Sequence, residues 1–173
     1  MQRFVWAVLF TLTFTSELSA QQPTPKKLTV ACAADKAIFS PSDSVNLTVS
    51  LENRGSSDVY IYRTLEWVWA GVGYRLTNDR GDVLQPRERI VPLPPLPLYD
   101  KSDLVGLHPG YFFGTPLVFD LSHYKLSPGV YYVQVLFWSN YHKEDGFGLP
   151  IFTFDDGEFP SNKVRIEVHS GRE

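Results

Sequence analysis

The sequence predicts an all-β fold, an antiparallel β-sandwich of seven to nine short strands. Apolar and polar residues alternate in several segments, and a period of two is typical of strands with one face in water. No segment shows the 3.6-residue apolar period that marks an amphipathic helix. The chain of 173 residues also contains 13 prolines and 12 glycines, which divide it into short segments. These patterns favour two packed sheets over a helical fold.

The expected strands follow one another along the chain. The clearest alternation lies in residues 44–53, whose inward positions are Val45, Leu47, Val49 and Leu51. Other strands are expected at 27–33, 59–65, 115–121, 130–138 and 162–168, with a hairpin at 74–84. Segment 130–138 gives the longest strand signal, with the inward positions Tyr131, Val133, Val135 and Phe137.

The hairpin at 74–84 has turn residues at its tip, from Asn78 to Gly81. Arg80, Gly81 and Asp82 also form the tripeptide that adhesive ligands present to integrins. A tight turn needs the same residue types, because glycine accepts a positive φ and polar neighbours face the solvent. The turn explains these residues more simply than adhesion does.

Two long connections do not fit the short loops of a simple sandwich. Residues 85–103 are too rich in proline for a central strand, and residues 139–160 are acidic and aromatic. Long loops in compact domains often carry function. A calcium site on the second connection stays open, although its spacing does not match an EF-hand; the carboxylates concerned are Asp145, Asp155, Asp156 and Glu158.

The N-terminus has the pattern of a secretory signal peptide. Arg3 precedes the apolar run "FVWAVLFTLTF", and small residues lead to a cleavage site after Ala20. The run is too short to span a membrane, which takes about 20 apolar residues. We therefore expect residues 1–20 to be removed and residues 21–173 to form one exported domain, periplasmic or extracellular. Thr29 is a poor residue three positions before a lipidated cysteine, which argues against a lipid anchor at Cys32.

Charge and residue chemistry narrow the possible functions. A net charge of −3 supplies no attractive field for nucleic acid or an anionic membrane. The single cysteine, Cys32, cannot form an internal disulfide, and it shares an inward row with Leu28 and Val30. The histidines lack zinc-site spacing, and no nucleotide-binding or hydrolase motif occurs. We expect a monomer without metal or cofactor, and not an enzyme.

Two aromatic groups indicate where a partner could bind. Trp67 and Trp69 share one face of an extended segment, and such a pair can either stack on sugar rings or fill a core. The outward row of 130–138 should be polar but carries Tyr132, Leu136 and Trp138. Either the segments 67–74 and 90–99 cover this row, or it is a partner surface.

Four stretches occur in an order that resembles a known family: "FSPSDSVNLTVSLENRG", "RLTNDRGDVL", "LSPGVYYV" and "FPSNKVRIEV". They resemble the immunoglobulin-like β-sandwich domains of exported bacterial proteins and are similar to the BsuPI-type proteinase inhibitors. The resemblance implies an immunoglobulin-like sandwich with a tyrosine corner around Leu126, Gly129 and Tyr131. No motif in this chain marks an inhibitory loop.

The sequence thus predicts a non-enzymatic exported binding module, whose partner is another protein of the cell envelope or the extracellular space. Two alternatives remain. One is a proteinase inhibitor of the BsuPI-like type, which rests on the resemblance. The other is a carbohydrate-binding module that uses Trp67 and Trp69.

Overall fold

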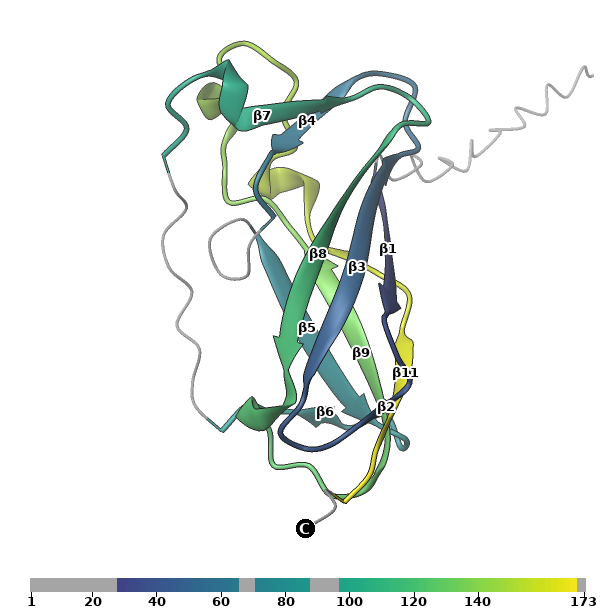
Figure 1. Ribbon diagram of the computed structural model, residues 1–173. Coiled ribbons are helices and arrows are strands. Elements are labelled where there is room, and N and C mark those ends of the chain that lie inside the picture. Colours follow the sequence, from purple (N-terminus) through teal and green to yellow (C-terminus); the bar gives the residue numbers. More distant parts are fainter. Residues whose placement is uncertain (1–27, 66–70, 88–96, 171–173) are drawn as a thin grey trace, which may run out of the picture.

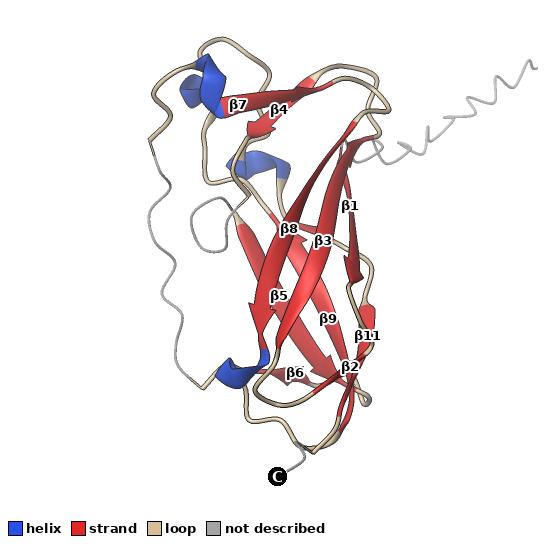
Figure 2. Ribbon diagram, viewed as in Figure 1, coloured by secondary structure: helices blue, strands red, loops and turns tan. Residues whose placement is uncertain are grey.

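The computed structural model describes residues 28–65, 71–87 and 97–170. Two β-sheets pack face to face, and a small two-stranded ribbon stands at one end of them (Figure 1). Strands dominate the described residues, and the helical pieces are short 3-10 turns (Figure 2). The two sheets together contain nine of the eleven strands in these residues, which agrees with the predicted sandwich of seven to nine strands. No described helix is long and apolar enough to cross a membrane.

The small sheet has three antiparallel strands in the order β1-β3-β8. They are β1 (Leu28–Ala34), β3 (Ser44–Asn53) and β8 (Phe112–Asp120). β3 is the central strand: its residues 47–53 pair with β1 and its residues 44–52 pair with β8. β8 begins at Phe112, earlier than the predicted 115–121, because its first residues continue the ladder with the end of β3.

The large sheet has the order β2-β11-β9-β5-β6, and β10 pairs with one end of β9. Its strands are β2 (Ile38–Phe39), β5 (Val72–Asn78), β6 (Val83–Leu84), β9 (Gly129–Phe137), β10 (Phe159–Pro160) and β11 (Val164–Val168). Its pairs are antiparallel except β2 with β11, which is parallel. The sandwich is thus antiparallel as predicted, and the two-residue edge strand β2 is the exception.

The strand order is that of an immunoglobulin-like sandwich. One sheet holds the first, second and fifth strands of that fold (β1, β3, β8), and the other holds the third, sixth and seventh (β5, β9, β11). The Tyr131 hydroxyl donates a 2.8 Å hydrogen bond to the Ser127 carbonyl oxygen. This is the tyrosine corner at the start of the sixth strand. The immunoglobulin-like fold predicted from the sequence is confirmed.

The inward rows of both sheets form one continuous core. The alternation predicted for 44–53 and 130–138 is confirmed, since every inward residue named in those segments is buried. Cys32 is 7% exposed among the same core side chains. Burial raises the pKa of its thiol to about 11, so Cys32 behaves as a small apolar residue at neutral pH.

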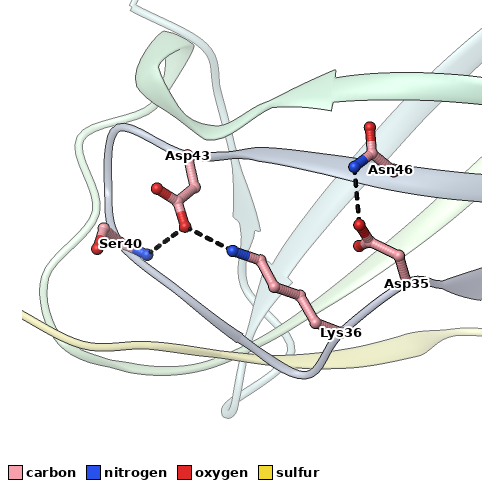
Figure 3. Close-up of polar contacts among 5 residues, drawn as sticks. All are labelled: Asp35, Lys36, Ser40, Asp43 and Asn46. Carbon is pink, nitrogen blue, oxygen red and sulfur yellow. Dashed lines mark hydrogen bonds and ion pairs between the residues drawn. The ribbon is translucent and has the colours of Figure 1, made fainter.

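A polar corner fixes the path of the chain from the small sheet to the large one. The Asp43 carboxylate accepts hydrogen bonds from the Ser40 amide at 3.1 Å and from the Lys36 ammonium at 3.0 Å (Figure 3). Asn46 donates to the Asp35 carboxylate at 2.7 Å. The pKa of Asp43 lies below its usual value. The hydrogen bond from the Ser40 amide contributes most to this shift, and the hydrogen bond from Lys36 comes second. These contacts set the turn between β1 and β3.

The ribbon consists of β4 (Val59–Tyr62) and β7 (Leu104–Leu107). Together with the connections 97–103 and 139–158 we call it the crown. Tyr60 fastens the second connection to β4, because its amide donates to the Pro150 carbonyl oxygen and its carbonyl accepts from the Phe152 amide. A small core of its own, in which Leu104, Tyr141 and Ile151 are buried, stabilises the crown.

Asn53 ties the crown to the sandwich. Its side chain is fully buried and donates to the carbonyl oxygens of Ser57 at 2.9 Å and Leu107 at 2.7 Å. The same side chain accepts from the Gly55 amide at 2.9 Å. Each polar group of this amide thus has a partner, as burial requires. Asn53 holds the end of β3 against β7.

The predicted long connections are partly structured. Residues 139–160 contain two 3-10 turns, η3 (Lys143–Gly146) and η4 (Phe154–Asp156), and end in β10. The described part of 85–103 contains no strand, and η1 (Lys101–Asp103) closes it. A last turn, η2 (Leu121–His123), follows β8. Trp67 and Trp69 lie outside the described residues, as do residues 67–70 and 90–96 of the two segments expected to cover the outward row. The described residues 72–74 do not cover that row, because they belong to β5 and pair beside β9.

Candidate functional site

The outward row of β9 lies on the outer face of the large sheet. Tyr132, Gln134 and Leu136 are half-buried, as is Trp138, which directly follows the strand. The register places Tyr132 between Thr77 of β5 and Arg165 of β11. It places Leu136 between Gly73 of β5 and Pro160 of β10. Three of the five predicted surface residues therefore share one face.

Gly71, Gly73 and the side-chain amide of Asn140 hold Trp138 in place. The Trp138 backbone amide donates to the Gly71 carbonyl oxygen at 2.7 Å, and its indole N–H donates to Asn140 Oδ1 at 3.0 Å. A Cβ added to Gly73 would lie 2.8 Å from the indole Cζ3 atom and 2.9 Å from Cη2. The indole therefore occupies the space that a side chain at position 73 would need.

A Cβ on Gly71 would overlap the Trp138 carbonyl group, and Gly71 has a φ of +70°. Both features require glycine at this position. The sequence "GVG" before Tyr74 is thus explained by the approach of Trp138 to the edge of β5.

A depression of about 320 Å³ lies beside this tryptophan, and we call it the outer-face depression. Leu136 and Trp138 line it together with Val83, which is 51% exposed. Arg75 and Glu158 also line it and form an ion pair at 3.5 Å. The other lining residues are Gly73, Tyr74, Leu84, Gln85, Pro86 and Tyr124. The depression can accept an apolar side chain beside a charged pair.

The sequence-predicted residues divide into three groups. Leu136 and Trp138 meet in the outer-face depression. Tyr132 lies on the same face, beside Thr77, without lining the depression. Trp67 and Trp69 fall outside the described residues, so their stacking role stays a prediction. Arg75, Val83 and Glu158 were missed, because the register of β5 and β6 against β9 joins segments far apart in the chain.

A second hollow, of about 620 Å³, lies in the crown, and we call it the crown groove. It is lined by Pro97, Leu98, Asn140, Tyr141, His142, Glu144, Asp145 and Phe147. Phe147 follows η3 with a φ of 53°, the left-handed region, and its side chain is 39% exposed. Such a conformation is uncommon for a bulky residue and is kept where the surroundings fix it.

Tyr141 forms the buried wall of the crown groove. Burial raises the pKa of its hydroxyl to about 12, with smaller contributions from Tyr62, Asp103 and Asp145. The Tyr62 and Tyr141 ring centroids are 5.8 Å apart. The phenol therefore stays neutral at physiological pH.

Three of the four carboxylates considered for calcium serve the loop backbone or an ion pair. Asp145 accepts from the His142 amide at 2.7 Å, and Asp156 accepts from the Thr153 amide at 2.9 Å. Glu158 instead pairs with Arg75. Within residues 28–65, 71–87 and 97–170, no group of three or more His, Cys, Asp or Glu residues could hold a metal ion.

The Arg80-Gly81-Asp82 tripeptide forms a closed turn at the tip of the β5–β6 hairpin. Asn78 Oδ1 accepts from the amides of Arg80 at 3.0 Å and Asp82 at 2.8 Å, and its Nδ2 donates to the Asp82 carboxylate at 2.8 Å. Gly81 has a φ of +89°. These contacts give each residue of the tripeptide a structural role.

No protein-family model matches the chain, and no curated protein matches it. Among solved structures it is similar to a β-glucosidase of Erythrobacter marinus, with 12% identity and a TM-score of 0.40 over 82% of this chain and 15% of that one. It is also similar to the sporulation control protein Spo0M of Bacillus subtilis, with 14% identity and a TM-score of 0.45 over 84% and 50%.

A third similar structure is an ASH/PapD-like domain of human CEP192, with 11% identity and a TM-score of 0.34 over 100% and 99% of the two chains. This chain thus spans 15% of the length of the β-glucosidase and half the length of Spo0M. Likenesses this distant do not bear on function. The resemblance to BsuPI-type inhibitors remains a prediction.

Proposed function

We propose that the protein is a non-enzymatic exported binding module and that another protein of the envelope or extracellular space docks on the outer-face depression. The observation that carries the proposal is the composition of this hollow. Leu136, Trp138 and Val83 supply apolar surface, and the Arg75–Glu158 ion pair adjoins them. An apolar centre with a polar rim is the usual anatomy of a protein interface.

The residue types support a protein partner. Tryptophan and arginine are enriched among the residues that contribute most to binding free energy. Trp138 is positioned by the Gly71 carbonyl and by Asn140, so little conformational entropy is lost when a partner packs against it.

Export rests on the N-terminal pattern of residues 1–20. Sequencing the N-terminus of the protein recovered from the producing cell is expected to give Gln21 as the first residue. A first residue of Met1, in protein from the cytoplasmic fraction, would contradict export.

The resemblance to BsuPI-type inhibitors supports a second proposal, inhibition of an exported proteinase. A panel of secreted proteinases tests it, since an inhibitor must slow at least one of them at micromolar concentration. The carbohydrate alternative depends on Trp67 and Trp69 and is tested by tryptophan fluorescence against a broad glycan panel.

Capture of the partner from the protein's own envelope extract tests the leading proposal. Immobilised chain is compared with Val83→Glu, which places a charge in the depression, and with Val118→Glu as a control. Val118 is 59% exposed on the small sheet, so the two substitutions are matched in exposure and charge. The captured protein is expected to be lost with Val83→Glu and kept with Val118→Glu. Equal capture by all three would contradict the proposal.

A further inference from the structure

We propose that the crown groove is a second binding site, which takes a lysine or arginine side chain from a peptide segment of a partner protein. This inference goes beyond the outer-face depression, because it concerns other residues and a different ligand chemistry. It rests on the shape of the groove, its apolar walls and its charge.

The groove has walls that fit an aliphatic stem. Pro97 and Leu98 come from the connection before η1, while Tyr141 and Phe147 come from the connection between β9 and β10. Leu98 packs against the buried crown residues, which keeps this side of the groove in place. Lysine and arginine side chains bury their methylene groups against such surfaces while the charged end stays near water.

Two carboxylates stand where the charged end of that side chain would lie. Glu144 and Asp145 both line the groove and are exposed. Asp145 Oδ2 is fixed by the His142 amide at 2.7 Å, so its carboxylate has a defined position. The exposed ring of Phe147 adds an aromatic face, and aromatic faces attract cations.

Acidic residues are enriched in the crown, where Glu144 and Asp145 line the groove and Glu158 pairs with Arg75 outside it. Segments 97–103 and 139–158 contain seven Asp and Glu residues but two lysines, whereas the net charge of the whole chain is only −3. The crown is therefore strongly acidic on a nearly neutral protein. Such complementarity favours a cationic partner and speeds its association.

A neutral glycan is the other ligand that an aromatic groove with carboxylates could accept. The charge distribution favours the cationic peptide, because the surplus of carboxylates attracts a cation while a neutral sugar feels no net Coulombic attraction. The two ligands differ in their response to salt, since only the ionic contact is screened.

The experiment measures fluorescence anisotropy of a labelled heptapeptide of alternating alanine and lysine, titrated with the purified exported chain. The matched peptide carries acetyl-lysine, which keeps the stem and removes the charge. We expect acetylation to weaken binding about tenfold or more, and ionic strength raised from about 0.05 to 0.3 M to weaken it several-fold.

Three variants locate the binding site. Glu144→Gln is expected to weaken binding about threefold, the size of one exposed ion pair. Asp79→Asn makes the same charge change in the exposed β5–β6 turn and is expected to leave binding unchanged. Phe147→Asn removes the ring but retains a residue that accepts a positive φ, and it should weaken binding several-fold. Circular dichroism checks that each variant is folded.

Three results would overturn the proposal. Equal binding of the acetylated peptide would show that no cation is recognised. Equal weakening by Glu144→Gln and Asp79→Asn would show attraction to the net charge alone. Salt-independent binding of a neutral oligosaccharide at Phe147, without peptide binding, would assign the groove to a glycan. None of these results bears on Val83, so the outer-face proposal is judged separately.

Discussion

The two outer faces of the sandwich follow the same backbone pattern but carry different side chains. On the small sheet most outward residues are small or polar, among them Ala31, Thr48 and Gly114. Its large apolar outward residues are Phe112 and Val118, which stay 71% and 59% exposed. On the large sheet, Tyr132, Leu136 and Trp138 occupy the outward row and are half-buried. The inward rows beneath the two faces are equally apolar and equally buried.

This difference separates the residues that the fold requires from those that it does not require. A sandwich requires apolar side chains on its inward rows, and both sheets meet that requirement. Nothing in the fold requires aromatic side chains on an outward row. The central strand of the small sheet, β3, has a polar outward row, so the fold forms without large side chains on the outward row of a central strand. The aromatic row of β9 therefore needs another reason, which we propose is a partner.

The largest effect is expected from replacing Trp138 with serine. The indole packs on Gly73 and donates to Asn140, so its loss should lower the free energy of unfolding by about 2–4 kcal/mol. Val118→Ser on the other face should cost about 0.5 kcal/mol or less. Urea unfolding followed by circular dichroism measures both values. Near-native stability of Trp138→Ser would show that the indole has no structural role and serves binding alone.

Strand β1 allows the chemical reactivity of an inward position, Cys32, to be compared with that of an outward position on the same strand. Burial raises the pKa of the Cys32 thiol to about 11 from 9.0, so the reactive thiolate at pH 8 should be about a hundredfold rarer than in an unfolded chain. Because protonation persists up to the raised pKa, native labelling should stay slow until the pH approaches 11.

A cysteine introduced at the exposed position Ala33, in a Cys32→Ala background, is the matched control. It should react at the rate of a free thiol. Maleimide labelling followed by mass spectrometry compares the two proteins, and rapid labelling of native Cys32 would contradict its inward position.

Two glycines on opposite faces provide a matched pair of smaller changes. Gly73→Ala places a methyl group 2.8 Å from the Trp138 ring, so the ring must move and stability should fall by about 1–2 kcal/mol. A Cβ at Gly114 would be 3.5 Å from the Val49 carbonyl oxygen, an ordinary contact, so Gly114→Ala should be neutral or slightly stabilising. Tryptophan fluorescence should shift with Gly73→Ala only, and equal shifts would mean that the indole does not lie on Gly73.

The smallest effect is expected at the tyrosine corner, where Tyr131 belongs to the inward row of β9. Tyr131→Phe removes the hydrogen bond to the Ser127 carbonyl oxygen and should cost about 1 kcal/mol. Tyr132→Phe, on the outward row, is the control and should change stability less. Thermal unfolding of both variants gives the comparison, and a larger cost for Tyr132→Phe would contradict the assignment of the corner.

The sequence predicted the body of the sandwich because local alternation determines which side chains turn inward. Leu47 and Val133 illustrate this, since each lies in a segment whose pattern alone assigns its face. The resemblance added the tyrosine corner at Tyr131. The parallel pairing of β2 with β11 could not be predicted, because a two-residue strand has no periodicity of its own.

The candidate sites were predicted only in part. Leu136 and Trp138 stood out because they broke the alternation of their own segment. Arg75 and Val83 gave no such signal, since their place beside Trp138 depends on the pairing of β5 with β9 and β6. The crown groove depends on the bridge between Tyr60 and Ile151, which joins residues about 90 positions apart. Such long-range pairings leave no mark on a local pattern.

Site-specific photocrosslinking in the producing cell tests most directly whether the aromatic face is the partner surface. The photoreactive residue p-benzoylphenylalanine replaces Val83 on the large sheet or Val118 on the small sheet, two positions of similar exposure. We predict a discrete covalent adduct with an envelope protein from position 83 and none from position 118. Adducts of equal yield from both positions, or an adduct from position 118 alone, would contradict the assignment of function to this face.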